Sequence, residues 1–211
     1  MPDRHPDDCE ELPLFPLGIV ALPGELIPLH IFEQRYQTMI AECLTFEGEL
    51  GIVWLSENEL REVGCAVEIE RILERLDDGR MNLLVRGTHP FRVLERLGHL
   101  PYPAGVIELL EDRPETPDPE LARAAHELYA DLVKRATDRD LDQELLSELS
   151  AYAMAATVDF GPDAKQGLLE LRSENARLGL LARLLRASIK RLELAGRAQA
   201  RARSNGKVSL G

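Results

Sequence analysis

The spacing of apolar residues changes about halfway along this chain of 211 residues. In the first half apolar and polar positions alternate, as at Cys65, Val67 and Ile69, a period of two that is typical of strands with one buried face. In the second half apolar residues recur every three or four positions, as at Leu121 and Ala125, which indicates amphipathic helices. The chain is therefore predicted to be an α+β protein in which strands precede helices.

The first half contains about six or seven short predicted strands. They are separated by turns rich in glycine and proline, and the turn at 77–79, Asp-Asp-Gly, predicts a hairpin. Strands are expected over 12–19, 26–31, 48–55 and 104–110 and twice or more within 63–97, with residues 86–90 as a link and one helix over 33–44. So many short strands favour a small, mostly antiparallel barrel, because closure removes unpaired edges.

The second half begins after a linker, residues 111–117, that contains two prolines. Asp118 and Pro119 predict the start of a helix, as N-cap and first helical residue. Further helices are expected over 142–156, from 162 to 171 and after Ser173, and together the four predict a bundle. The predicted domains are a barrel over 10–112 and a bundle over 118–196. Residues 1–9 and 200–211 have little to bury and are predicted to be disordered.

Charge is unevenly distributed along the chain. The whole sequence has 25 basic and 37 acidic residues, a net charge of -12, whereas residues 172–203 have nine basic and two acidic residues. An acidic body repels phosphate backbones and anionic lipid, so nucleic acid and membranes are unfavourable partners. No apolar stretch is long enough to span a bilayer, and the polar N-terminus lacks a signal sequence. A cytoplasmic location is expected.

Motifs of common catalytic and cofactor sites are missing from the sequence. There is no phosphate-binding loop, dinucleotide fingerprint, H-E-x-x-H pair or nucleophile elbow. The three cysteines have no C-x-x-C spacing, and the five histidines lack the spacing of metal ligands. We therefore expect no catalytic residue, cofactor or metal. A hydrolase built from scattered histidines and carboxylates is the less favoured alternative.

Three residues are candidates for a binding surface: Phe15, His30 and Trp54. His30 and Trp54 also have a structural interpretation. His30 lies in an apolar strand, where a histidine is commonly satisfied by a backbone partner. Trp54 lies in a run of apolar residues, where a core anchor is favoured over an exposed recognition residue.

Several stretches resemble a known family. The sequence LPLFPLG at 12–18, followed by LPG at 22–24 and PLHIFEQRY at 28–36, closely resembles the opening signature of the Lon protease N-terminal domain. The sequence DGRMNLLVRG at 78–87 is similar to a later part of that domain in order and spacing. The resemblance covers residues 10–112 and extends more weakly through the helices to about residue 195.

The resemblance implies a PUA-like pseudo-barrel followed by a helical bundle, which in Lon recognises protein substrates and contributes to assembly. The ATPase and Ser-Lys peptidase portions of Lon have no counterpart here, so the chain looks like a stand-alone bacterial substrate-binding-domain protein. The expected function is non-catalytic binding of unfolded or apolar polypeptide, as an adaptor in protein quality control, with self-association as a further expectation. Binding is expected either in a groove between barrel and bundle or by strand addition near residues 12–17. An RNA-binding PUA-like module is the alternative, which the acidic charge disfavours.

Overall fold

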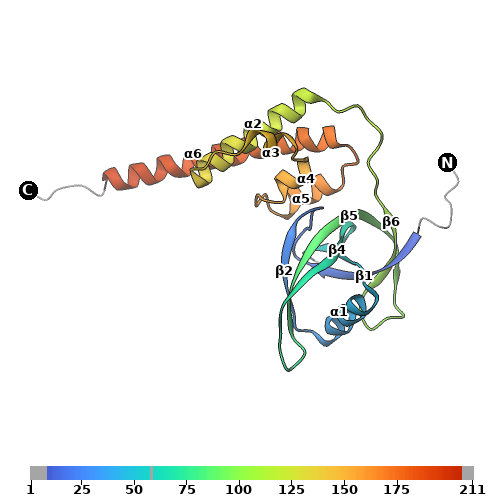
Figure 1. Cartoon of the computed structure of the whole chain (residues 1–211). Coiled ribbons are helices and arrows are strands. Elements are labelled where there is room, and N and C mark those ends of the chain that lie inside the picture. Colours follow the sequence, from blue (N-terminus) through green and yellow to red (C-terminus); the bar gives the residue numbers. More distant parts are fainter. Residues whose placement is uncertain (1–8, 58, 206–211) are drawn as a thin grey trace, which may run out of the picture. The chain divides into compact units, whose positions relative to one another are not determined.

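The computed structural model describes residues 9–57 and 59–205. This part of the chain contains six strands and six helices (Figure 1). Its internal contacts divide it into two compact units. We call residues 9–114 with 152–173 the barrel unit, and residues 115–151 with 174–205 the helical unit. The predicted α+β class is confirmed.

The barrel unit contains all six strands. In chain order its first elements are β1 (Cys9–Leu17), β2 (Leu26–Ile31), α1 (Gln34–Phe46), β3 (Leu50–Ser56), β4 (Glu59–Arg75), β5 (Met81–Leu97) and β6 (Ala104–Leu109). The bounds of β2 are those predicted from sequence, and α1 begins one residue later than predicted. Local pattern thus located most of these elements.

Five of the strands close into a barrel. Their order is β5-β4-β3-β1-β6, and β6 pairs again with β5 to complete the ring. β2 is added to the first half of β5, outside this ring. The pairings are antiparallel except that of β1 with β3, which is parallel with Leu14 opposite Gly51. The predicted barrel is therefore present, and closure leaves few strand edges unpaired.

The two longest strands, β4 and β5, each contain 17 residues and form the hairpin predicted at 77–79. Gly79 has a φ of +87° in this turn, a value that glycine adopts without strain. The predicted link at 86–90 is wrong, because β5 continues through Pro90. The β4–β5 register shifts beside this residue, between Cys65 and Val67, and such an irregularity tolerates a proline that cannot donate a ladder hydrogen bond.

Phe91 lies in the core of the barrel and is fully buried. Its ring occupies the space over two glycines. A Cβ atom at Gly51 would lie 2.5 Å from Phe91 Cζ, and one at Gly64 would lie 2.7 Å away. The remaining buried residues of this cluster are Leu12, Leu14, Val53, Ala66 and Ile107. Glycines on two strands therefore give the aromatic ring its place in the core.

The helical unit is built on the pairing of α2 (Pro119–Thr137) with α6 (Glu174–Asn205), which pack along each other (Figure 1). The predicted start of α2 is confirmed. The Asp118 side chain accepts hydrogen bonds from the amides of Glu120 and Leu121, which satisfies two of the free N–H groups at the helix start.

The predicted helix over 142–156 is broken into α3 (Gln143–Ser147) and α4 (Ala151–Ala155). Asp142 caps the first, accepting from the Glu144 amide at 2.8 Å. The amide of Ala151 donates to Glu174 Oε1 at 2.6 Å. A carboxylate distant in sequence thus caps the new helix start, which local periodicity does not reveal.

The last helix of the barrel unit is α5 (Pro162–Leu169). Gln166 Nε2 donates to the Val63 carbonyl at 3.1 Å, and Lys165 forms a largely buried ion pair with Glu25. The predicted bundle over 118–196 includes α5, whereas the contacts assign this helix to the barrel unit. Helical periodicity identifies an apolar face but not the element that covers it.

The predicted disorder at 1–9 and 200–211 lies mostly outside the described residues. Where the structure describes these segments, Cys9 begins β1 and residues 200–205 continue α6. Within the described ranges, no helix combines the length and the apolar character needed to cross a membrane.

Candidate functional site

An apolar groove of about 530 Å³ opens on the barrel unit. It lies where the ends of β1 and β2 meet the start of α1 and the adjoining ends of β3 and β4. The apolar side chains that line it include Phe15, Leu17, Ile31, Phe32, Leu55 and Leu60. This volume is within the range of ligand-binding clefts.

Two strands that border the groove have an open side. Residues 14–17 of β1 pair with β3 on one side, and β2 pairs with β5 on one side. Among the described residues, no strand pairs with the other side of either segment. Residues 9–13 of β1 pair with β6, and the Leu14 amide donates to the Pro103 carbonyl. The edge predicted at 12–17 is therefore open only at its last three residues. Unpaired backbone groups on such edges can bond to an added extended chain.

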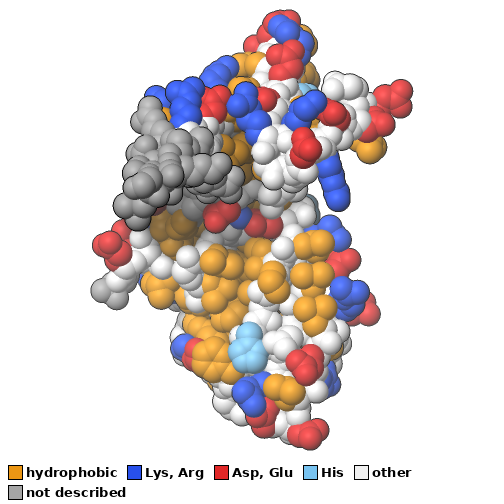
Figure 2. Space-filling view, turned by 90° about the vertical axis from the view of Figure 1, so that its left-hand side faces the viewer, with side chains coloured by type: hydrophobic (Ala, Val, Ile, Leu, Met, Phe, Trp, Pro, Cys, Tyr) orange, Lys and Arg blue, Asp and Glu red, His pale blue; other side chains and the backbone are white. Residues whose placement is uncertain are grey.

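Large apolar side chains are exposed at the groove. Phe32 is 61% exposed and Leu55 is 43% exposed. Figure 2 shows hydrophobic side chains gathered over one face of the barrel unit, in the lower part of the view. Exposed apolar groups beside a concave surface are typical of binding sites.

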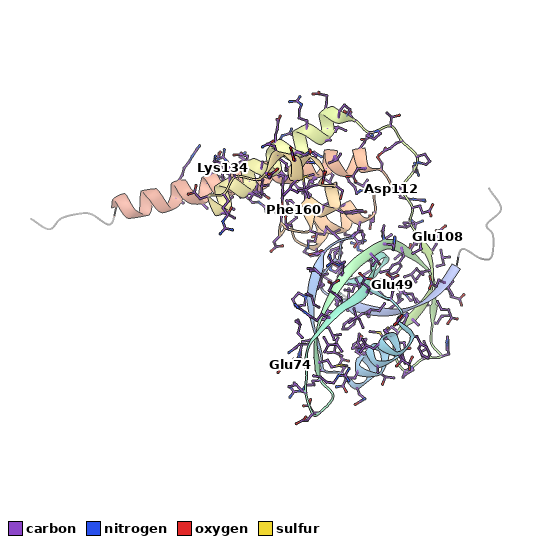
Figure 3. All side chains as sticks on the ribbon, viewed as in Figure 1. Glu49, Glu74, Glu108, Asp112, Lys134 and Phe160 are labelled. Atoms are coloured by element: carbon purple, nitrogen blue, oxygen red, sulfur yellow. The ribbon has the colours of Figure 1, made fainter. Side chains whose placement is uncertain are left out.

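His30 is held at the groove by a chain of polar side chains. Its Nδ1 lies 2.7 Å from Asn82 Oδ1, and Asn82 Nδ2 donates to Oε2 of Glu74, labelled in Figure 3, at 2.7 Å. Because Asn82 Oδ1 is an acceptor, Nδ1 of His30 carries the proton. The imidazole also stacks on Phe32, with ring centroids 5.8 Å apart. The groove wall is thus partly pre-organised.

Tyr36 also lines the groove, and its ring lies 4.4 Å from that of Phe15 between centroids. The guanidinium of Arg35 lies 4.5 Å from the centre of the tyrosine ring and also pairs with Glu33. Burial raises the pKa of Tyr36, so the phenol is neutral at ordinary pH. Around Tyr36 the groove therefore presents aromatic rings, and the charge of Arg35 is balanced by Glu33.

The structure brings two of the three predicted residues together at the groove, Phe15 and His30. The partner of His30 is a side chain and not the backbone group considered from sequence. Trp54 does not line the groove. It is buried, and the Arg61 guanidinium lies 5.3 Å from the centre of its ring.

Sequence reasoning missed Phe32, Leu55 and Leu60. Phe32 directly precedes the helix predicted over 33–44, but α1 begins only at Gln34 and the phenylalanine ring is exposed. Its position directly after a strand was a usable signal, because strand ends are where binding residues concentrate. Leu55 and Leu60 are opposite each other across β3 and β4, a register that the sequence does not display.

Other groups with potential chemistry have structural partners. Arg86 pairs with Glu70 at 2.9 Å, and hydrogen bonding to Arg86 lowers the pKa of Glu70. Cys43 and Cys65 are buried, and desolvation raises the pKa of both thiols, that of Cys43 to about 11. In the part of the chain with described coordinates, no three His, Cys, Asp or Glu side chains are grouped to hold a metal ion.

Comparison with known proteins decides the family. The family model of the ATP-dependent protease La (LON) substrate-binding domain matches residues 11–187. The chain belongs to this family. The resemblance stated from the sequence signatures is therefore confirmed, and the match continues through the helices that follow the barrel.

Two relatives of this Lon-family chain are bacterial Lon proteases. The chain is 30% identical over 209 residues to Lon protease of Anaeromyxobacter dehalogenans (strain 2CP-C), covering 88% of this chain and 24% of that protein. It is 28% identical over 214 residues to Lon protease 2 of Myxococcus xanthus, covering 90% of this chain and 25% of that protein. The chain therefore spans about a quarter of the length of the curated relatives it matches.

Solved structures of Lon N-terminal domains share this fold. The Lon N-terminal domain protein from Xanthomonas campestris has a TM-score of 0.64 and 27% identity, covering 82% of this chain and 96% of that one. The N-terminal domain of Mycobacterium avium complex Lon protease has a TM-score of 0.64 at 18% identity, covering 83% of this chain and 98% of that one. The second likeness concerns the fold alone.

Proposed function

We propose that the barrel unit binds apolar segments of unfolded polypeptides in the groove between β1 and β2. The family supports this proposal, because its matching model describes a substrate-binding domain. The observation that carries it is the apolar groove itself, with Phe32 and Leu55 exposed beside it and two open strand edges at its border.

An unfolded segment suits this groove in two ways. It offers apolar side chains that a folded protein has already buried, and these can cover the exposed rings and leucines. It also offers unpaired N–H and C=O groups, which can bond to the open edges of β1 and β2. A folded protein offers neither, so the groove discriminates between the two states without reading a particular sequence.

The expected affinity is modest. Burying one large apolar side chain contributes roughly 1.5–3 kcal/mol, while ordering a flexible segment and losing its translational freedom offset much of this gain. A groove that accepts one or two side chains therefore predicts dissociation constants no tighter than about 0.1 mM. Weak, reversible capture fits a module that releases its client.

We further propose that the chain is non-catalytic and acts as an adaptor in protein quality control. The match covers the substrate-binding part of relatives that are about four times longer. A client held here would be passed to a protease or chaperone. Self-association remains a separate prediction, which light scattering of the purified chain tests directly.

Binding is tested with the full chain and a short fluorescein-labelled peptide in which Leu and Phe alternate with Ser. Fluorescence anisotropy should give saturable binding, and Phe32→Ser should weaken it about tenfold because an aromatic contact is lost. Phe46→Ser is the matched control, because Phe46 is 79% exposed at the end of α1 and does not line the groove. Equal affinities of both variants and the parent chain, or no binding at all, contradict the proposal.

RNA binding has less support. Residues 9–114 and 152–173 include 11 basic and 22 acidic side chains, and a net negative unit repels a phosphate backbone. The groove is also lined mainly by apolar and aromatic groups. A gel-shift titration with structured RNA at low salt tests this alternative.

A further inference from the structure

A second, polar hollow of about 700 Å³ adjoins the apolar groove on the barrel unit. Leu60 lines both depressions, so a ligand that passes Leu60 in the groove reaches the hollow. The charged side chains that line the hollow are Glu59, Arg61, Glu62, Arg92, Arg96 and Glu170. Three arginines thus lie beside an apolar site.

These arginines have unused hydrogen-bonding capacity. Arg96 Nη2 donates to the Leu60 carbonyl at 3.3 Å. Arg61 Nε is buried and has no hydrogen-bond partner, while its guanidinium lies over the ring of Trp54. Neither Arg61 nor Arg92 forms an ion pair with any carboxylate in residues 9–57 and 59–205. A buried donor without a partner is costly, and native structures usually satisfy it.

The local fold keeps the arginines in place. Arg92 of β5 lies opposite Val63 of β4, in the regular part of that ladder. The Val63 carbonyl is bonded to Gln166 of α5, and the same Gln166 amide donates to Glu170 at 2.8 Å. Glu170 is therefore already engaged. Rigid neighbours of this kind reduce the entropy that an arginine loses when it binds a ligand.

The acidic residues decide which anion fits. Glu59 and Glu62 are exposed at the hollow, and the whole unit has an excess of acidic side chains. A polymer of phosphates would meet this negative field along its entire length. A single carboxylate meets it once and gains charge-assisted, bidentate hydrogen bonds from guanidinium groups. The charge pattern thus favours one carboxylate over a polyanion.

We propose that the polar hollow binds a carboxylate of the same polypeptide that fills the apolar groove. Its class of ligand is therefore an apolar segment followed within a few residues by an acidic group. The carboxylate is that of an Asp or Glu side chain or of the C-terminus, which share the chemistry that arginine recognises. This inference rests on the proposed function and specifies the polypeptides that the groove prefers.

The test uses the full chain and three labelled peptides with one common apolar core. The first has a Glu after the core and an amidated C-terminus, the second has no Glu and a free C-terminus, and the third has neither carboxylate. At low salt at least one of the first two should bind about tenfold more tightly than the third. The peptide that binds more tightly than the third identifies the source of the carboxylate.

Arg92→Gln should remove most of this advantage while leaving the affinity for the third peptide unchanged. Arg61→Gln should act in the same direction, and thermal melting of both variants shows whether the barrel remains folded. Arg80→Gln is the matched control, because Arg80 lines neither depression and pairs with Asp78 in the hairpin turn. It should change none of the three affinities.

Three results overturn the inference, and they differ in what they say of the groove. If all three peptides bind equally well, the hollow does not select a carboxylate and the proposed function stands. If none binds, both proposals fail. An advantage for the acidic peptides that survives Arg92→Gln together with Arg61→Gln also contradicts the assignment to these arginines.

Discussion

The barrel unit and the helical unit obtain their order in different ways. In the barrel unit the groove joins Phe15, His30, Leu60 and Pro103, which only strand pairing brings together. In the helical unit much of the order is local, with a cap at Asp118 and ion pairs between successive turns, such as Arg135 with Asp131. Sites on the barrel therefore depend on closure of the whole sheet, whereas the helices follow rules that act over a few residues.

The charges of the two units differ as well. The barrel unit has an excess of 11 acidic side chains, whereas residues 115–151 and 174–205 have 12 of each sign. The net charge of the protein thus belongs mainly to the barrel unit. Within the helical unit, Arg183, Arg186 and Lys190 of α6 are exposed, while its buried side consists of residues such as Leu181 and Leu185.

The largest difference between the units is expected when an apolar side chain is truncated. Phe91→Ala removes a fully buried ring and should lower the free energy of unfolding by about 3–5 kcal/mol. Leu192→Ala on α6, where the side chain is 42% exposed, should cost less than about 1 kcal/mol. Urea unfolding, followed by the fluorescence of the single tryptophan Trp54 and by circular dichroism, measures both. Similar losses in the two variants would abolish the distinction.

Adding a methyl group should have opposite signs in the two units. A Cβ at Gly87 would lie 2.1 Å from the Leu22 carbonyl oxygen, so Gly87→Ala should destabilise the protein by about 1–3 kcal/mol as the backbone shifts. Gly179 lies inside α6 with no atom within 4 Å of such a Cβ. Gly179→Ala should therefore stabilise by about 0.5–1 kcal/mol. Thermal melting of the two variants should move in opposite directions from the parent chain.

Ion pairs should contribute unequally in the two units. The side chains of Lys165 and Glu25 in the barrel unit are only 15% and 12% exposed, and Lys165→Met should cost about 2 kcal/mol because Glu25 is left without its counter-ion. Lys134, labelled in Figure 3, pairs with Asp140 in the helical unit, where both are exposed. Lys134→Met should cost less than about 1 kcal/mol. An equal cost, measured by urea unfolding at two salt concentrations, would refute this ranking.

A further effect concerns alkaline pH and the barrel unit. Burial raises the pKa of Cys43 from 9.0 to about 11, so between these values the folded protein keeps a proton that the unfolded chain releases. Stability should therefore fall as pH rises through this window, because the folded state binds more protons. Cys43→Ala should make the fall shallower. The remaining fall in stability should come from Cys65, Tyr36 and Tyr102, which are also buried and whose pKa values are also raised.

Unfolding of the parent chain and of Cys43→Ala at mildly basic and strongly basic pH measures this contribution. The three cysteines of the chain lie at 9, 43 and 65. The helical unit therefore contains no cysteine and offers an internal reference. An identical pH dependence of the two proteins would exclude Cys43 as a contributor.

The family was predictable because its signatures are local in sequence. The stretches at 12–18 and 28–36 combine strand, turn and helix entry, and the family match confirms the assignment drawn from them. The candidate site was only partly predictable. Phe15 and His30 lie within these signatures, but Leu55 and Leu60 belong to β3 and β4, whose register shifts between Val53 and Leu55. A one-residue difference in register reverses the face of a side chain.

Sequence alone determined the change from strands to helices along the chain, the bounds of β2, the hairpin at 77–79 and the cap at Asp118. Each depends on periodicity or on the conformational preferences of a few adjacent residues. Tertiary structure alone decided the assignment of α5 to the barrel unit, the burial of Trp54 under Arg61 and the meeting of groove and arginine hollow at Leu60. These features require closure of the barrel, which brings together residues from β1, β2, β4 and β5 that no local pattern relates.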